Sequence, residues 1–344
     1  MILVLTLAAG LWGVGALLRV PQALRVGMVT GLWLAVVGLH LALPDGHPLR
    51  MATGGEARVW LAFGVVALLV LGYRKLLVLL REKSVVAEVS APGAFRPAEL
   101  DRYARHILLR EIGGPGQRKL KDSKVLVVGA GGLGSSALLY LAAAGVGVIG
   151  VIDDDVVEGS NLQRQIIHAD QRIGMAKVQS AAGAMQALNP FIEVRPYQRR
   201  LTADIATGLI GDYDLVLDGS DNFDTRYLVN RVCADLGKPL VSAAITQWEG
   251  QISLYDPERG TPCYECVFPV RPLPGMVPSC AEAGVVAPLP GIIGSMMAME
   301  AVKHITGAGV SLAGRLMIYD ALYGEVRVIG VKRRADCAVC GVSA

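Results

Sequence analysis

A glycine-rich turn is the first feature of the sequence that predicts chemistry. Residues 129–134 read Gly-Ala-Gly-Gly-Leu-Gly, after the apolar run 124–128 and before a run typical of a helix, 135–144. Glycines let the backbone approach a phosphate, and the free N–H groups at a helix N-terminus attract anions. A second apolar run, 148–153, ends on an acid that can accept hydrogen bonds from ribose hydroxyls. The pattern predicts a nucleotide site and, taken alone, favours NAD. The candidate contacts are Gly129, Gly131, Gly132, Gly134 and Asp153.

Charged side chains follow the turn at positions that suit a phosphate ligand. Arg164, and Lys177 near the start of a predicted helix 176–188, can neutralise a triphosphate in a chain that has no P-loop motif. Each could instead be a solvated surface cation. Asp221 follows the apolar run 215–217, and open α/β sheets bind ligands at the carboxyl ends of their strands. Asp221 is therefore a candidate Mg²⁺ ligand or the N-cap of a helix beginning near Phe223, and the two roles are compatible.

Four of the six cysteines form two C-x-x-C pairs, Cys263 with Cys266 and Cys337 with Cys340. Four thiolates suit a tetrahedral zinc ion, and the 70 residues between the pairs mean that the ion would clip the C-terminus to the rest of the domain. A redox C-x-x-C motif needs only one pair of cysteines. A catalytic zinc keeps one coordination position open, and the five histidines offer no clear set of ligands for such a site. Structural zinc is the prediction.

The two other cysteines receive different interpretations. Cys233 lies in an apolar helical run, 227–236, and is expected in the core. Cys280 lies in a Pro- and Gly-containing stretch, 272–283, that reads as a mobile loop. A loop thiol can be a nucleophile, and it can also be incidental.

The elements that must position these side chains follow from the alternation of strand-like and helix-like runs over residues 98–344, which is typical of one α/β domain with a full core. Residues 84–97, with two prolines, a glycine and two serines, are a predicted linker. The domain has no basic run typical of a nucleic-acid surface.

The first 83 residues have a different composition, which explains a mean hydropathy of +0.46 for the whole chain. Residues 1–43 contain two charged side chains, whereas residues 84–344 contain 52 of the 63. Three apolar stretches, 1–18, 26–43 and 59–80, predict about three transmembrane helices, because about 20 residues span a bilayer core. The first stretch lacks the basic start and the cleavage site of a signal peptide. Apolar helices that pack on the α/β domain are the alternative.

The positions of Lys and Arg suggest an orientation for this region. Arg19 and Arg25 separate the first two stretches, and Arg74, Lys75, Arg81 and Lys83 lie in or after the third. The chain would cross the inner membrane several times. By the positive-inside rule we expect the α/β domain to lie in the cytoplasm. Adenine nucleotides and reduced thiols are found on that side.

Together these motifs make residues 97–344 resemble the MoeB/ThiF/HesA family, bacterial relatives of ubiquitin-activating enzymes. The resemblance is carried by RYARHILL (102–109), VLVVGAGGLGS (125–135), DDDVVEGSNLQRQ (153–165), GMAKV (174–178), DGSDN (218–222), CYEC (263–266), CAEAGVVAPLPGIIGSMMAMEAVK (280–303) and CAVCG (337–341). It implies a doubly wound, Rossmann-like mixed sheet that binds ATP rather than NAD, and a homodimer.

The resemblance also implies roles for single residues. Gly132 would lie against the phosphates of ATP, and Asp153 would hold the ribose. Asn161, Arg164 and Lys177 would contact the phosphates, while Asp221 would bind Mg²⁺ with Asn222 beside it. Arg105 matches an arginine that reaches into the partner subunit's ATP site. The four paired cysteines match zinc ligands. Cys280 matches a loop cysteine that links to the sulfur carrier in the thiamine branch and is dispensable in the molybdopterin branch.

The activity implied is adenylation of the C-terminal Gly-Gly carboxylate of a small ubiquitin-like sulfur carrier protein, with release of pyrophosphate. Residues 280–303 and 318–327 look more like the molybdopterin-synthase adenylyltransferase, with a MoaD-like carrier, than like the thiamine enzyme, with a ThiS-like carrier. Because no rhodanese-type region follows, a separate sulfurtransferase or cysteine desulfurase is expected to supply sulfur. A membrane-tethered NAD-dependent oxidoreductase and a non-catalytic carrier-binding scaffold are the alternatives. The membrane region departs from the soluble pattern of the family.

Overall fold

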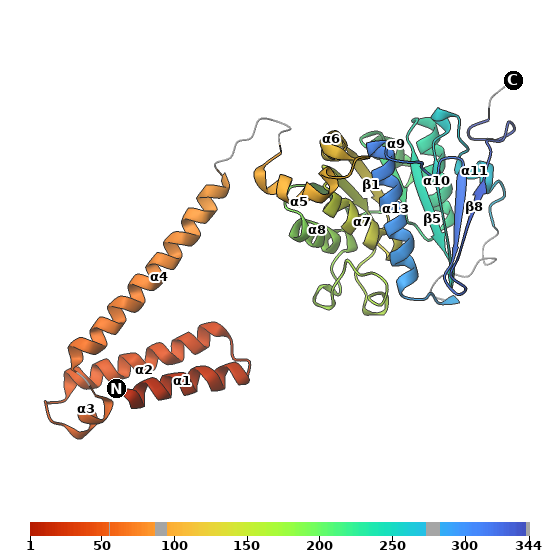
Figure 1. Cartoon of the computed structure of the whole chain (residues 1–344). Helices are drawn as coiled ribbons and strands as arrows, with labels where there is room; N and C mark the ends of the chain where they lie inside the picture. Colours follow the sequence, from red (N-terminus) through yellow and green to blue (C-terminus); the bar gives the residue numbers. More distant parts are fainter. Residues whose placement is uncertain (55, 87–94, 273–282, 342–344) are drawn as a thin grey trace. The chain divides into compact units, whose positions relative to one another are not determined.

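The structure, a computed structural model, describes residues 1–54, 56–86, 95–272 and 283–341, with the backbone alone for residues 78–86. The chain divides into two compact units, Met1–Ala91 and Pro92–Ala344 (Figure 1). The first unit is helical in its described part, and the second is a sheet with helices on both faces.

The second unit is built on an eight-stranded mixed sheet of order β3-β2-β1-β4-β5-β6-β7-β8. The first five strands along the chain pair in parallel, and β5 to β8 pair antiparallel. The chain runs outward from β1 to β3 and then returns to place β4 on the other side of β1, so the strand order reverses between β1 and β4. Open α/β sheets bind ligands at such a reversal. The strands are β1 (Lys124–Val128), β2 (Val148–Ile152), β3 (Glu193–Tyr197), β4 (Leu215–Asp218), β5 (Leu240–Ile245), β6 (Glu249–Tyr255), β7 (Arg315–Asp320) and β8 (Glu325–Gly330).

The alternation of side chains along β1 creates two cores, one on each face of the sheet. Val125 and Val127 pack with α7, α8 and α13, whereas Leu126 and Val128 pack with α9 and α10. Successive side chains of a strand point to opposite faces, so an apolar run such as 124–128 requires helices on both. The helices of this unit are α5 (Pro97–Ile107), α6 (Gly113–Asp122), α7 (Gly132–Ala144), α8 (Lys177–Leu188), α9 (Ala203–Gly211), α10 (Phe223–Asp235), α11 (Tyr264–Val267) and α13 (Pro288–Thr306), with short 3₁₀ turns η1 (Gly159–Asn161), η2 (Asp170–Arg172) and η3 (Pro257–Arg259). The mixed, Rossmann-like sheet predicted from the resemblance is confirmed.

The first unit contains α1 (Ile2–Leu17), α2 (Gln22–Ala42), α3 (Pro48–Thr53) and α4 (Ala57–Val86). The Trp33 indole N–H donates to the Trp60 carbonyl at 3.0 Å, and the Trp60 indole N–H donates to the Gly54 carbonyl at 3.0 Å. These bonds join α2 to the start of α4. The α1 helix runs back along α2, so Met1 lies beside Gly54.

The prediction of three membrane spans is wrong in its count. Two helical stretches in the described part of the chain are long and apolar enough to cross a bilayer, Gln22–Ala42 and Ala57–Leu77, and most of their side chains are exposed. The α1 helix has 16 residues. At 1.5 Å per residue it is about 24 Å long, shorter than the roughly 30 Å hydrocarbon core of a bilayer.

The boundaries of this region also differ from those expected. The α2 helix begins four residues before the predicted stretch and includes Arg25, whose guanidinium lies 5.2 Å from the centre of the Trp12 ring. The stacked ring accommodates the charge within an otherwise apolar helix pair. The α4 helix continues through residues 84–86, which were expected in the linker, and α5 begins at Pro97.

Candidate functional site

The glycine turn lies at the strand-order reversal, between β2 and the segment that follows β4. Gly129 has a φ of +94°, a conformation that other residues rarely adopt, and its N–H donates to the Ile152 carbonyl at 2.9 Å. A methyl group on Gly134 would lie 2.0 Å from the Gly129 carbonyl oxygen. Because no side chain separates them, α7 begins at Gly132, within the glycine turn and three residues earlier than expected.

Ala130, at the centre of the turn, is held on both sides by side chains. Its N–H donates to Asp153 Oδ2 at 2.8 Å, and its carbonyl accepts from His168 Nε2 at 2.9 Å. The other oxygen of Asp153 accepts from the Asp155 N–H at 2.8 Å. Burial raises the pKa of Asp153 above its ordinary value, against the effect of these hydrogen bonds. A carboxylate has about four acceptor positions, so Asp153 can still receive ribose hydroxyls.

The predicted phosphate-binding cations are not free on the surface. Lys177 is 5% exposed, and its Nζ lies 2.6 Å from Asp155 Oδ2, so the interpretation of Lys177 as a solvated cation is wrong. The half-buried Arg164 donates to Asn161 Oδ1 at 2.7 Å. The stem of Arg164 lies 3.7 Å from the position of a methyl group on Gly132, so this pair lies beside the N-terminus of α7.

Asp221 lies two residues beyond Gly219, whose carbonyl oxygen is 3.2 Å from the position of a methyl group on Gly129. The carboxylate is exposed. The N-cap of α10 is Asn222, whose Oδ1 accepts from the Thr225 N–H at 2.9 Å. The N-cap role considered for Asp221 is therefore wrong, and its side chain is free to take another partner.

Two buried residues that shape this edge of the sheet were not singled out from the sequence. Asp218 is fully buried and accepts hydrogen bonds from the N–H and hydroxyl of Ser220 and from the Ser242 hydroxyl. Arg226, 5% exposed, lies 3.8 Å from Asp218 and donates to the Ser220 carbonyl at 2.6 Å. These bonds fix the turn that carries Asp221. The sequence does contain one signal for Asp218, because this acid comes directly after the apolar run 215–217.

His168 was also passed over, as one of five scattered histidines. Its Nδ1 lies 3.0 Å from the Ser180 hydroxyl, and burial lowers the pKa of the ring below the ordinary value. Nothing in the spacing of residues 161–168 could show that this side chain would return to the glycine turn.

Three other candidate residues do not belong to the group of side chains around the glycine turn. Arg105 is exposed on α5 and is not among the side chains that contact the glycine turn. Cys280 lies outside the described residues. Cys233 is 2% exposed and in the core, as predicted.

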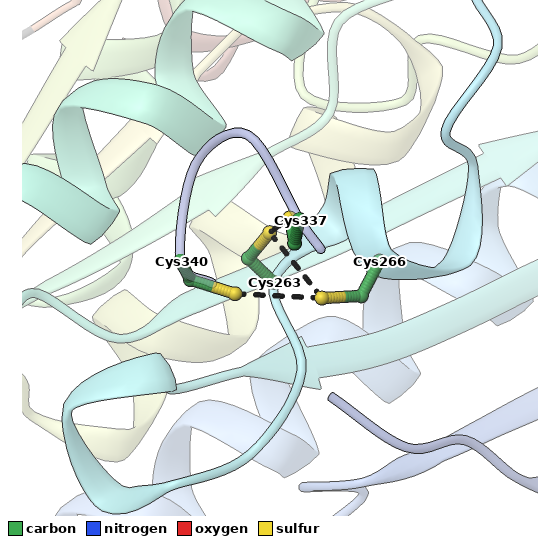
Figure 2. Close-up of side chains that lie close together, drawn as sticks. All are labelled: Cys263, Cys266, Cys337 and Cys340. Atoms are coloured by element: carbon green, nitrogen blue, oxygen red, sulfur yellow. Dashed lines mark hydrogen bonds between the residues drawn. The ribbon is translucent and has the colours of Figure 1, made fainter. Parts of the chain in front are cut away.

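The four paired cysteines converge at one place in the fold (Figure 2). Cys263 Sγ lies 3.6 Å from Cys337 Sγ and 3.9 Å from Cys266 Sγ, which in turn lies 3.4 Å from Cys340 Sγ. All four sulfur atoms lie within 4.8 Å of one another. Zn–S bonds of about 2.3 Å in a tetrahedron place sulfurs about 3.8 Å apart, so this set fits a zinc ion.

The backbone around the four cysteines lets the chain segments that carry them pack closely. A methyl group on Gly341 would lie 2.5 Å from the Cys337 carbonyl oxygen. The Arg334 N–H donates to Cys266 Sγ at 3.4 Å, as an N–H group does to a thiolate that binds a metal. Four cysteines occupy all positions of a tetrahedron, so the cluster suits a structural ion and not a catalytic one.

Comparison with known proteins agrees with this geometry. The model of the ThiF family matches residues 103–339. The chain is 50% identical over 248 residues to the sulfur carrier protein adenylyltransferase of Thermus thermophilus, covering 71% of this chain and 91% of that protein. It is 48% identical over 243 residues to the SAMP-activating enzyme E1 of Haloferax volcanii, covering 71% and 89%. It is 48% identical to the probable adenylyltransferase/sulfurtransferase MoeZ of Mycobacterium tuberculosis, of which it covers 63%.

Solved structures show the same fold at lower identity. The structure of E. coli MccB with MccA-N7isoASN aligns with a TM-score of 0.63 and 24% identity, covering 70% of this chain and 75% of that one. The structure of PaaA aligns with a TM-score of 0.61 and 23% identity, covering 87% and 90%.

Proposed function

Because the chain belongs to the ThiF family, we propose that it is a nucleotidyltransferase that adenylates the C-terminal carboxylate of a small ubiquitin-like sulfur carrier protein. The observation that carries this proposal is the placement of Arg164, Asn161 and the Lys177–Asp155 pair around a glycine turn at the N-terminus of α7. A helix N-terminus with cations beside it suits a polyphosphate. An NAD-dependent oxidoreductase would share the turn and Asp153 but does not account for Arg164, Lys177 and the four-cysteine site together.

The reaction needs charge neutralisation more than proton transfer. A carboxylate oxygen of the carrier attacks the α-phosphorus of ATP, a new P–O bond forms, and the bond to the β-phosphate oxygen breaks to release pyrophosphate. The attacking carboxylate is already ionised at pH 7, so no general base is required. Arg164 and Lys177 oppose the negative charge of the phosphates, and the N–H groups at the start of α7 bind their oxygens.

Mg²⁺ is the divalent ion that carboxylates and phosphates hold together. Asp221 would be its protein ligand in our proposal, with Asn222 beside it, and the bound ion would supply further charge neutralisation. The free and exposed carboxylate of Asp221 at the carboxyl end of β4 supports this assignment.

The test is carrier-dependent exchange of labelled pyrophosphate into ATP. We expect exchange with a carrier that ends in Gly-Gly and none with a carrier that lacks those two residues. Asp221→Asn should lower the rate by about 10²–10³, the usual cost of losing one charge that stabilises a transition state. Asp212→Asn, at an exposed acid after α9, is the matched control.

Two results would contradict the proposal at different levels. Full exchange by the Asp221→Asn variant would remove Asp221 from the metal site. Stabilisation of the protein against heat by NAD and not by ATP would replace adenylation with the oxidoreductase alternative.

The choice of carrier rests on the resemblance in residues 280–303 and 318–327. The carrier is MoaD-like, in molybdopterin biosynthesis, and a ThiS-like carrier of the thiamine pathway is the second candidate. A separate sulfurtransferase or cysteine desulfurase supplies sulfur to the adenylated carrier. The enzyme is a homodimer in which Arg105, exposed on α5, serves the partner subunit's ATP site. Pyrophosphate exchange with the two carriers, compared at equal concentration, decides the branch.

The remaining proposals concern zinc and the membrane. Zinc bound by the four cysteines is structural, and the sulfur positions support it. The helices α2 and α4 hold the enzyme in the inner membrane with the second unit in the cytoplasm, where ATP is present. Their length and exposed apolar side chains support this location.

A further inference from the structure

We propose that His168 is a positioning residue for ATP: by holding the Ala130 carbonyl, it keeps the Gly131 N–H directed toward the phosphates. The inference rests on the proposed function. The proposed mechanism gives roles to charged side chains near the phosphates and none to His168.

The hydrogen bond between His168 and Ala130 has one possible direction. A carbonyl can only accept, so His168 Nε2, 2.9 Å from the Ala130 oxygen, carries the hydrogen. Nδ1 of the neutral ring then accepts from the Ser180 hydroxyl at 3.0 Å. His168 is 7% exposed and Ser180 is 1% exposed, so the ring is held in one orientation by α8.

The peptide between Ala130 and Gly131 links this bond to the phosphate side of the turn. In a planar trans peptide the carbonyl and the following N–H point in opposite directions. A carbonyl fixed toward His168 therefore directs the Gly131 N–H away from it. Gly131 is the N-cap of α7, and in the described part of the chain its N–H has no acceptor. That N–H is available to an anion at the helix N-terminus.

The peptide between Ala130 and Gly131 needs a side chain to hold it, because the backbone alone allows it to flip. Rotation of this peptide by half a turn would change φ of Gly131, and glycine accepts positive and negative φ almost equally. The flipped peptide would present a carbonyl oxygen to the phosphates in place of an N–H. Asp153 holds only the other peptide of Ala130, through its N–H at 2.8 Å. His168 is the side chain that makes the flip costly.

The experiment compares His168→Leu with His168→Gln in the full-length protein. Leucine removes the donor, whereas the glutamine amide can donate from nearly the position of Nε2. For His168→Leu we expect KM for ATP in the exchange reaction to rise about ten-fold, the cost of losing one buried hydrogen bond and its alignment. The value of kcat and the KM for the carrier should stay within about two-fold. His168→Gln should restore KM for ATP, and His304→Gln is the control at another histidine.

A purely structural role would give a different pattern. It would reduce the amount of active enzyme, so kcat would fall while KM for ATP stayed constant. Binding of ADP and of adenosine, measured by calorimetry, adds a second readout. His168→Leu should weaken ADP binding and leave adenosine binding unchanged, because only ADP has phosphates.

The outcomes separate this inference from the proposed function. If the native protein shows no carrier-dependent exchange and binds neither ATP nor ADP, the proposed function fails. If it binds ADP and His168→Leu binds equally well, or if His168→Gln is as impaired as His168→Leu, the inference is overturned. Should His168→Leu not fold, Ser180→Ala keeps the imidazole but releases it, and we expect a smaller rise in KM for ATP; an unchanged KM would count against the inference.

Discussion

At the scale of the residue, the site is organised by hydrogen bonds between side chains and the backbone turns they hold. Asp153 and His168 hold the turn after β1, and Asp218 and Arg226 hold the turn after β4. The side chains proposed to meet ATP, such as Asp221, lie on these turns or beside them. Substitution of a supporting residue should therefore change affinity for the nucleotide more than it changes the chemical step.

Two histidines, the buried His168 and the half-buried His304, give the stability of the fold a dependence on pH. Burial lowers the pKa of His168 and of His304 below the ordinary value of 6.5. Asp153, Lys177 and Arg172 act on His168, and Asp256, Arg259 and Glu300 act on His304. As pH falls below about 6.5 the unfolded chain takes up protons first, so the free energy of unfolding decreases until pH lies below the folded pKa values.

We therefore expect the melting temperature in detergent to fall between pH 7.5 and 5.5. His168→Gln and His304→Gln, which cannot take up that proton, should each show a smaller fall than the native protein. Equal falls in all three proteins would show that these histidines do not control the acid response.

At the scale of the element, the cysteine cluster joins two segments that are distant in the chain. Cys263 is the N-cap of the short helix α11, and Cys266 lies within that helix. Cys337 and Cys340 follow the last strand, β8. An ion bound between them would fix the C-terminal segment, whose exposed strand β8 forms an edge of the sheet. The cluster is remote in sequence from the glycine turn and contributes no ligand to it.

Removal of zinc should consequently lower stability and leave nucleotide binding intact. We expect Cys340→Ser to lose bound zinc and to melt about 5–10 °C lower, equivalent to about 2–3 kcal/mol for a unit of this size. Its affinity for ATP should stay within about two-fold. Cys233→Ser, at a buried cysteine outside the cluster, should retain zinc. Zinc bound in full by Cys340→Ser would contradict a four-cysteine site.

At the scale of the whole molecule, the chain combines a unit that matches the ThiF family with a helical unit of different composition. The family match lies within the second unit, and the Thermus thermophilus relative is covered over 91% of its length by 71% of this chain. The first unit exposes apolar side chains along α4, among them Leu68, Leu69 and Leu71. Such a surface is expected where lipid replaces water.

We predict that the full chain stays in the membrane fraction after washing at alkaline pH, whereas residues 92–344 are soluble and retain carrier-dependent exchange within about two-fold. A cysteine introduced at Asp45, between α2 and α3, should react with a membrane-impermeant maleimide on intact cells or spheroplasts. One introduced at Asp101, on α5, should react only after lysis. Release of the full chain by the wash, or the opposite labelling pattern, would reject the proposed membrane location or orientation.

Several features could be predicted from the sequence because they depend on neighbouring residues. The strand 124–128, the glycine turn and helix 176–188 follow from apolar periodicity and from the backbone freedom of glycine, and the structure places them within a few residues of expectation. The pairing of cysteines at C-x-x-C spacing likewise pointed to one four-sulfur site. The count of membrane spans was wrong because the first apolar stretch forms a helix of only 16 residues, shorter than the hydrocarbon core of a bilayer.

Other features were decided only by tertiary structure, because they join residues whose separation in the chain carries no periodic signal. Residue types and their order along the chain were enough to predict that a glycine turn, cations and an acid follow one another in an α/β domain. Packing decided that Lys177 would be buried against Asp155, that Asn222 and not Asp221 would cap α10, and that His168 would hold Ala130. A buried polar group must find a partner in whatever part of the chain the fold brings near it, and the order of strands determines which part that is.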